Sequence, residues 1–183
     1  MIQYKYSTFW PRVCAGLVDG LIFMPLGWIY FFTFYHFDSV PLLILASVVN
    51  SSAFLAYSIW MHGTRGQTFG KMACKVIVLD ASERPLSMRQ AVLRDLFGVV
   101  LLPIGLAIDI SRIVHGTDVS AQANMTTLDS IIAYSALGWF LVEVVTMLTN
   151  DKRRALHDFI AGSVVILNHG CPEENRSGHI LLR

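Results

Sequence analysis

Two carboxylates lie inside long apolar runs of the sequence. Asp19 falls in the run 13–35, and Glu143 falls in the run 130–150. On insertion scales an acidic side chain at the middle of a membrane helix costs about 2.5–3.5 kcal/mol, so such residues usually face the interior of a helix bundle. We therefore expect both carboxylates to lie against other helices, where they could bind a cation or exchange a proton.

The two carboxylates are expected at one depth. Asp19 follows Arg12 by seven positions and Glu143 precedes Asn150 by seven, so each lies about 10 Å inside the basic side of the membrane. Asn50 lies near the middle of another apolar run. We predict that Asp19 and Glu143 face each other and form an ion or proton site with Asn50, because two carboxylates in a low dielectric raise the pKa of at least one. The alternative is that both are structural anchors, with Asp19 paired to a basic residue and Glu143 protonated.

A second charged group follows the last apolar run, in the sequence DKRRALHD. Lys152 and Arg153 are typical of basic residues that fix topology and bind anionic lipid head groups. Asp158 is expected to pair with Arg12 or Arg154 and to close the cytoplasmic end of the bundle. Its predicted role is structural.

Two further patterns concern contacts of helices. Asp109 and Arg112 are three positions apart, which is the spacing of a local ion pair on one helix. Gly16 and Gly20 form a GxxxG motif, which is expected to let another helix approach closely.

Four apolar runs could hold these residues in a membrane. A span needs about 20 mostly apolar residues, and we assign spans to about 13–35, 41–61, 96–114 and 130–150. Apolar residues make up 54% of the 183 residues and charged residues 15%, whereas a soluble domain is about a quarter charged. The predicted fold is an all-α membrane protein with four transmembrane helices.

The basic residues predict the orientation. All but one of the 14 lysines and arginines fall in segments on the same side of the four spans, and the exception, Arg112, ends the third span. Basic flanks are retained in the cytoplasm. Both termini are therefore expected in the cytoplasm, with the protein in the inner (cytoplasmic) membrane. A net charge of +1 gives no reason to expect nucleic acid as a partner.

The loop between the second and third spans is predicted to be structured. Residues 75–80 have strand character and 80–85 are turn material, which predicts a short β-hairpin. Ser87 and Gln90 form a capping box that begins a helix.

That helix is predicted to be amphipathic and to lie at the membrane interface. Its Arg89 and Arg94 are expected to extend to lipid phosphates. Thr126 and Asp129 form a similar capping box before the fourth span.

Other chemistry is not predicted. The three cysteines are too scattered for a disulfide framework, and the tail 169–183 lacks trustworthy metal-ligand spacing at His169, Cys171 and His179. No nucleophile has a recognisable partner, so we expect no metal, no cofactor and no enzymatic activity. Residues 1–168 form the predicted membrane domain, and the tail is expected to be a flexible polar extension.

Three segments in order are similar to the signatures of a bacterial family of integral membrane proteins. They are 12–19 (RVCAGLVD), 66–71 (GQTFGK) with the strand and Arg94 after it, and 151–158 (DKRRALHD). From about Phe9 to about Leu167 the chain resembles the RDD family, named for one arginine and two aspartates.

The resemblance assigns the three signature residues to Arg12, Asp19 and Asp158, with Asp151 as the alternative for the last. The biochemical role of the family is poorly defined; transport has been suggested for it, including cation/proton exchange, and the resemblance extends this expectation to the present chain.

Two functions remain open from the sequence. The first is a small cation/proton transporter, expected to be a homo-oligomer because so short a chain has little room for inverted repeats. The second is a non-enzymatic adaptor or regulator that binds another membrane protein. A polar cavity that contains Asp19 and Glu143 would favour transport, whereas a dry packed interface would favour the adaptor.

Overall fold

The computed structural model describes residues 5–116 and 127–168. Three predictions fall on the remaining residues: the flexible tail 169–183, the His169, Cys171 and His179 set, and the capping box that begins at Thr126. They lie outside the described part of the chain.

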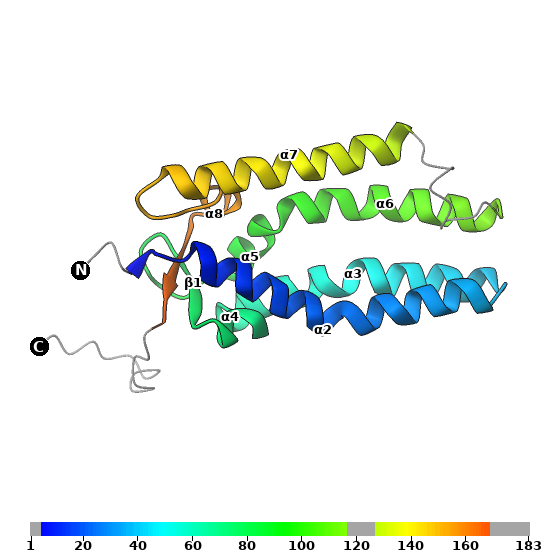
Figure 1. The fold of residues 1–183 in the computed structure, drawn as a ribbon, viewed down its shortest axis with the longest axis horizontal. Coiled ribbons are helices and arrows are strands. Elements are labelled where there is room, and N and C mark those ends of the chain that lie inside the picture. The colour runs from blue at the N-terminus through cyan, green and yellow to red at the C-terminus, as the bar shows by residue number, and fades with distance from the viewer. Residues whose placement is uncertain (1–4, 117–126, 169–183) are drawn as a thin grey trace, which may run out of the picture.

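Four long helices form the body of the molecule (Figure 1). They are α2 (Phe9–His36), α3 (Val40–Arg65), α6 (Leu96–Val114) and α7 (Thr127–Thr149). Each is long and apolar enough to cross a membrane, which confirms the four predicted spans and the helical membrane class. The first helix begins four residues earlier than predicted, so that Arg12 lies in its first turns rather than before it.

The long helices bury very little of their own apolar surface. In the most apolar window of each, only 6–11% of residues are buried, and large side chains such as Leu21, Trp28 and Phe140 are more than half exposed. Soluble monomeric proteins rarely expose an apolar surface of this size to water. The exposed faces fit contact with lipid, and the protein is a membrane protein.

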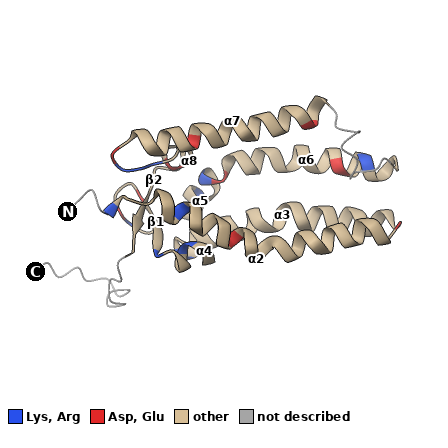
Figure 2. Ribbon diagram, viewed as in Figure 1, with Lys and Arg blue, Asp and Glu red and all other residues tan. Residues whose placement is uncertain are grey.

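Five short elements gather at one end of the bundle, which we call the sheet end. They are α4 (Phe69–Ala73), β1 (Val76–Asp80), α5 (Met88–Arg94), α8 (Leu156–Ile160) and β2 (Ser163–Leu167). Figure 2 shows that the lysines and arginines of the described residues gather there, except near the far end of α6. That exception is Arg112, in the last turn of α6.

The strand at 75–80 forms as β1, but the predicted hairpin is wrong in its partner. β1 pairs antiparallel with β2, from Val76 opposite Leu167 to Asp80 opposite Ser163. The chain does turn back after β1 and makes an isolated bridge between Leu79 and Pro85. No second strand follows the turn, because Ser87 immediately caps α5.

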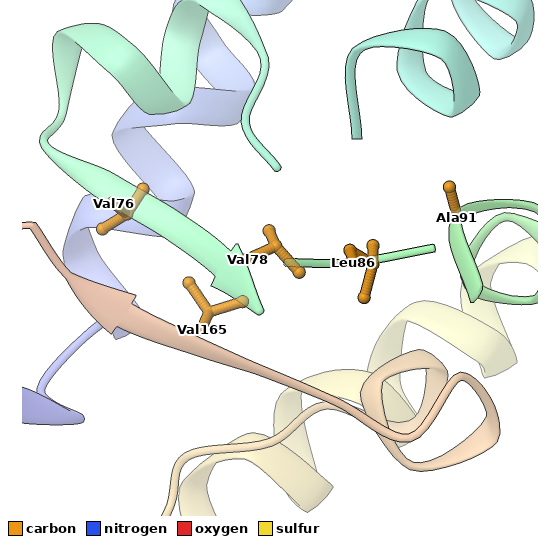
Figure 3. Packing of buried hydrophobic residues seen from close by; sticks show 5 residues of the cluster. All are labelled: Val76, Val78, Leu86, Ala91 and Val165. Carbon is orange, nitrogen blue, oxygen red and sulfur yellow. The ribbon is translucent and has the colours of Figure 1, made fainter. Parts of the chain in front are cut away.

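A small apolar core fastens the two strands to the loop (Figure 3). It consists of buried side chains from β1, β2, the turn and α5: Val76, Val78, Leu86, Ala91 and Val165. This core holds β2 against β1 and α5 at the sheet end, so that residues after the fourth span lie beside residues of the central loop.

The predicted capping box is present at the start of α5. The Ser87 hydroxyl accepts from the Gln90 amide, and the Gln90 side chain accepts from the Ser87 amide. The prediction for Arg94 is wrong, however. Arg89 is exposed, but Arg94 is buried and makes contacts within the protein instead of extending to lipid.

Candidate functional site

A cavity of ≈ 550 Å³ lies at the sheet end, between the long helices and the short elements, and its wall combines ionisable side chains with apolar ones such as Phe54, Phe140 and Met147. α2 and α3 contribute Arg12, Asp19, Ser58 and His62 to its wall. The short elements and α7 contribute Lys71, Arg94, Asp95, Glu143 and His157. We call this space the polar cavity.

Asp19 is held in the cavity wall by three neutral donors. Its Oδ1 accepts from the Tyr57 hydroxyl at 2.9 Å and from the Gly70 amide at 2.8 Å, and its Oδ2 accepts from the Thr68 hydroxyl at 2.6 Å. The side chain is 4% exposed. Among the described residues no ion pair involves Asp19, so the negative charge of its carboxylate has no cationic partner there.

Gly70 is what allows α4 to approach α2 so closely. A Cβ at this position would lie 2.1 Å from the Ala15 carbonyl oxygen and 2.8 Å from Cγ of Asp19. By contrast, a Cβ on Gly16 or Gly20 would meet nothing within 4 Å. The expectation that the GxxxG pair admits a neighbouring helix is therefore wrong within this chain, and the close approach occurs at Gly70.

Asp158 forms the second buried carboxylate site, which we call the Asp158 clasp. It is 0% exposed. Arg12 Nη1 donates to its Oδ2 at 2.6 Å, and Arg94 Nη1 donates to its Oδ1. The Ala155 amide and the Ser163 hydroxyl add bonds of 3.0 and 3.1 Å. Burial alone would raise the pKa of Asp158, but Arg94 and Arg12 hold that pKa well below its ordinary value.

The clasp confirms one predicted pair and decides between two aspartates. Asp158 pairs with Arg12, which was one of its two expected partners. Arg154 instead donates to the backbone oxygen of Asp158 at 3.1 Å. Asp151 is exposed, so the buried partner of Arg12 is Asp158.

Arg94 also sets the hydrogen-bonding state of His157. Arg94 Nη2 lies 2.9 Å from His157 Nε2, and a guanidinium can only donate, so Nε2 accepts. The proton of the neutral imidazole must then be on Nδ1, which contacts Glu143 Oε1. Arg94 thus orients His157 as a hydrogen-bond donor to Glu143.

The predicted ion site is only partly assembled. Asp19 and Glu143 both line the polar cavity, but each has its own partners from other elements. Asn50 is not among the described residues of the cavity wall. Asn150 caps the chain turn after α7, where its Oδ1 accepts from the Arg154 amide at 2.8 Å.

Arg112, which the sequence pairs with Asp109 on α6, donates to Asp129 near the start of α7. The ion pair therefore joins two helices at the end of the bundle opposite the sheet.

The sequence did not single out several residues of the cavity, among them His62, Lys71 and Asp95. One signal was available: Ser58 and His62 are four apart on α3 and so share one face. The contact between Lys71 and His62 had no such signal, because it depends on how α4 folds back.

The comparison with family models decides the classification. The model of the RDD family matches residues 6–162. The chain belongs to the RDD family. No curated protein and no solved structure matched it.

The residues that carried the resemblance have clear places in this RDD protein. Arg12 and Asp158 are bonded to each other across the sheet end, and Asp19 lies on the same helix as Arg12 in the wall of the polar cavity. The three side chains therefore belong to one connected region, although they come from opposite ends of the chain.

Proposed function

We propose that this RDD protein is a small, non-enzymatic cation/proton transporter that uses the polar cavity as its exchange site. The observation that supports this function most directly is that one cavity contains both Asp19 and Glu143. Two membrane carboxylates that face a common space can attract a cation and can also take up a proton.

The partners of the two carboxylates suggest different tasks. Asp19 is fixed by neutral donors, so its charge remains available to attract a cation. Glu143 is bonded to a neutral imidazole that is itself held by Arg94. In the proposed cycle Glu143 binds either a proton or, as a carboxylate, a cation. Competition for this one carboxylate couples the two fluxes.

The orientation is part of the proposal. The lysines and arginines gathered at the sheet end (Figure 2) support a cytoplasmic location for both termini in the inner membrane. Lys152 and Arg153, which follow α7, are the residues we expect to contact anionic lipid head groups. We expect the working unit to be a homo-oligomer.

The test is cation-driven proton flux in proteoliposomes that contain the purified full-length protein. We expect sodium or potassium gradients to move protons. Glu143→Gln, which removes the exchangeable charge, should reduce the flux at least about tenfold. Glu83→Gln is the matched control, because Glu83 is a half-exposed carboxylate bonded to Lys5 outside the cavity.

Asp19→Asn should also reduce the flux, since the remaining fixed charge is lost. Unchanged flux in both Glu143→Gln and Asp19→Asn would exclude the exchange function.

An adaptor is the second candidate, and one observation favours it. A Cβ on Gly20 of α2 would meet nothing within 4 Å in the described chain, so a helix of another membrane protein has room to pack there. Gly20→Leu, at a position outside the wall of the polar cavity, would release such a partner without changing proton flux. If wild type and variant copurify with the same proteins, the adaptor function is contradicted.

A further inference from the structure

A chain of hydrogen bonds joins four side chains in the wall of the polar cavity. Lys71 Nζ on α4 contacts His62 Nε2 on α3. His62 Nδ1 lies 3.2 Å from Ser58 Oγ, and Ser58 Oγ donates to Asp95 Oδ2 at 2.9 Å. His62 and Ser58 are 3% and 5% exposed, so the middle of the chain is buried in the cavity wall.

The chemistry of the two ends fixes the direction of every donor. The Lys71 ammonium has no acceptor site, so it must donate to His62 Nε2. The neutral imidazole then carries its proton on Nδ1 and donates to Ser58, whose own hydroxyl proton is directed at Asp95. All donors point from Lys71 toward Asp95, and the Asp95 carboxylate ends the chain as an acceptor.

We propose that Lys71, His62, Ser58 and Asp95 form a proton relay that connects the polar cavity with a second cavity along α3 and α6. The relay serves the proton half of the exchange described above, and as a part of that transport it rests on the proposed function.

The proton balance of the relay closes without any further reactant. Lys71 gives a proton to His62 Nε2 and becomes a neutral amine. His62 gives its Nδ1 proton to Ser58 Oγ, and Ser58 gives its hydroxyl proton to Asp95 Oδ2. The products are neutral Lys71, the other tautomer of His62, an unchanged serine and protonated Asp95. One proton has moved the length of the chain. The relay is reset when Lys71 takes up a proton from the polar cavity, Asp95 releases its proton, and the imidazole and the serine hydroxyl return to their first proton positions.

Asp95 is placed to pass the proton on. It lines the polar cavity and also the second cavity, of ≈ 380 Å³, whose mostly apolar wall includes Ser51 and Asp109. Asp95 and Asp109 are 14 positions apart along α6 and its N-cap, which corresponds to about 21 Å of helix. The second cavity therefore extends from the relay toward the end of the bundle opposite the sheet.

The charged groups around Lys71 favour release of its proton. Burial lowers the pKa of Lys71 well below its ordinary value, and Arg94 on α5 and Arg12 on α2 lower the pKa further. Asp158 on α8 and Asp95 oppose this effect more weakly. Around His62, His157 on α8 is the remaining titratable neighbour, in addition to Lys71 and Arg94.

The test uses a pair of substitutions at Ser58 in the full-length protein in proteoliposomes. Ser58→Ala removes the hydroxyl that joins His62 to Asp95, whereas Ser58→Thr retains it. Ser52→Ala is the control, because the Ser52 hydroxyl donates only to the Val48 carbonyl oxygen of its own helix. We expect Ser58→Ala to slow cation-driven proton flux at least about tenfold and to change its solvent deuterium isotope effect. Ser58→Thr should restore most of the flux that Ser58→Ala loses, and Ser52→Ala should behave like the wild type.

A second measurement keeps the relay separate from the exchange function. Infrared difference spectra across a pH titration report the protonation of Asp95, which Asp95→Asn identifies. We expect Lys71→Met to shift the Asp95 titration, and Ser58→Ala, but not Ser58→Thr, to uncouple Asp95 from Lys71. If wild-type liposomes show no cation-driven flux, the exchange function fails while the infrared test still decides the relay. Identical Asp95 titrations in wild type, Lys71→Met and Ser58→Ala would overturn the relay.

Discussion

Two aspartates, both buried at the sheet end, are stabilised in opposite ways. Asp158 is surrounded by cations, with Arg12 and Arg94 on its two oxygens. Asp19 is surrounded by neutral donors, namely two hydroxyls and a backbone amide. The clasp neutralises its carboxylate, whereas the Asp19 site holds a carboxylate in place without neutralising it.

The difference fits the structural role expected for Asp158 and the transport role proposed for Asp19. Breaking a buried ion pair leaves unpaired charge in a low dielectric, so the clasp resists change and ties α2, α5 and α8 together. The Asp19 site keeps a geometrically fixed negative charge facing a cavity. Only the second arrangement leaves charge with which a cation can interact, and this distinction underlies the three predictions below.

The largest effect is expected from Asp158→Asn. The substitution leaves the guanidinium groups of Arg12 and Arg94 buried beside each other without an anion, which should lower the free energy of unfolding by about 3–5 kcal/mol. Thermal or denaturant unfolding in detergent measures this loss. Asp151→Asn is the control, because Asp151 is exposed. Equal stability of the two variants would show that the clasp is not structural.

The pH dependence sharpens the same prediction. Because Arg94 and Arg12 outweigh burial and hold the pKa of Asp158 well below its ordinary value, its stabilising effect is fully present above the unfolded-state pKa of about 3.9. The effect is lost as the pH falls through the lowered pKa. The stability difference between wild type and Asp158→Asn should therefore be constant from neutral pH to about pH 4 and shrink below it.

An intermediate effect is expected from Gly70→Ala. The added Cβ would overlap the Ala15 carbonyl oxygen and Cγ of Asp19, so α4 must move away from α2 and the Gly70 amide must leave Asp19. Overpacking of this kind costs about 1–3 kcal/mol. Gly16→Ala is the matched control on α2, because its Cβ would meet nothing within 4 Å. If both alanine variants unfold at the wild-type temperature, the close packing of α4 is contradicted.

The smallest loss of stability is expected from Asp19→Asn. The amide keeps the shape of the carboxylate, and no cation is left unpaired, so the cost should be about 1 kcal/mol. The same unfolding measurement, made beside Asp158→Asn, tests the order of the two effects. A larger loss for Asp19→Asn than for Asp158→Asn would reverse the assignment of the two sites.

The sequence alone determined the features that depend on nearby residues. Hydropathy gave the four spans, including the third at 96–114, because burial in lipid depends on the composition of about 20 consecutive residues. The capping box at Ser87 followed from a spacing of three residues. The importance of Arg12, Asp19 and Asp158 came from the resemblance and from the free energy of placing charge in a membrane.

Only the tertiary structure decided which of these residues meet. Arg12 and Asp158 are separated by 146 positions, and β1 takes its partner from beyond the fourth span instead of from the next turn. The residues around Arg94 in the sequence predicted that its side chain extends to the lipid surface. In the structure Arg94 is buried, because α8 places the buried carboxylate of Asp158 beside it. Such pairings depend on how distant elements pack and on the need of buried charges for partners where water is excluded. Neither can be inferred from a short segment of the sequence.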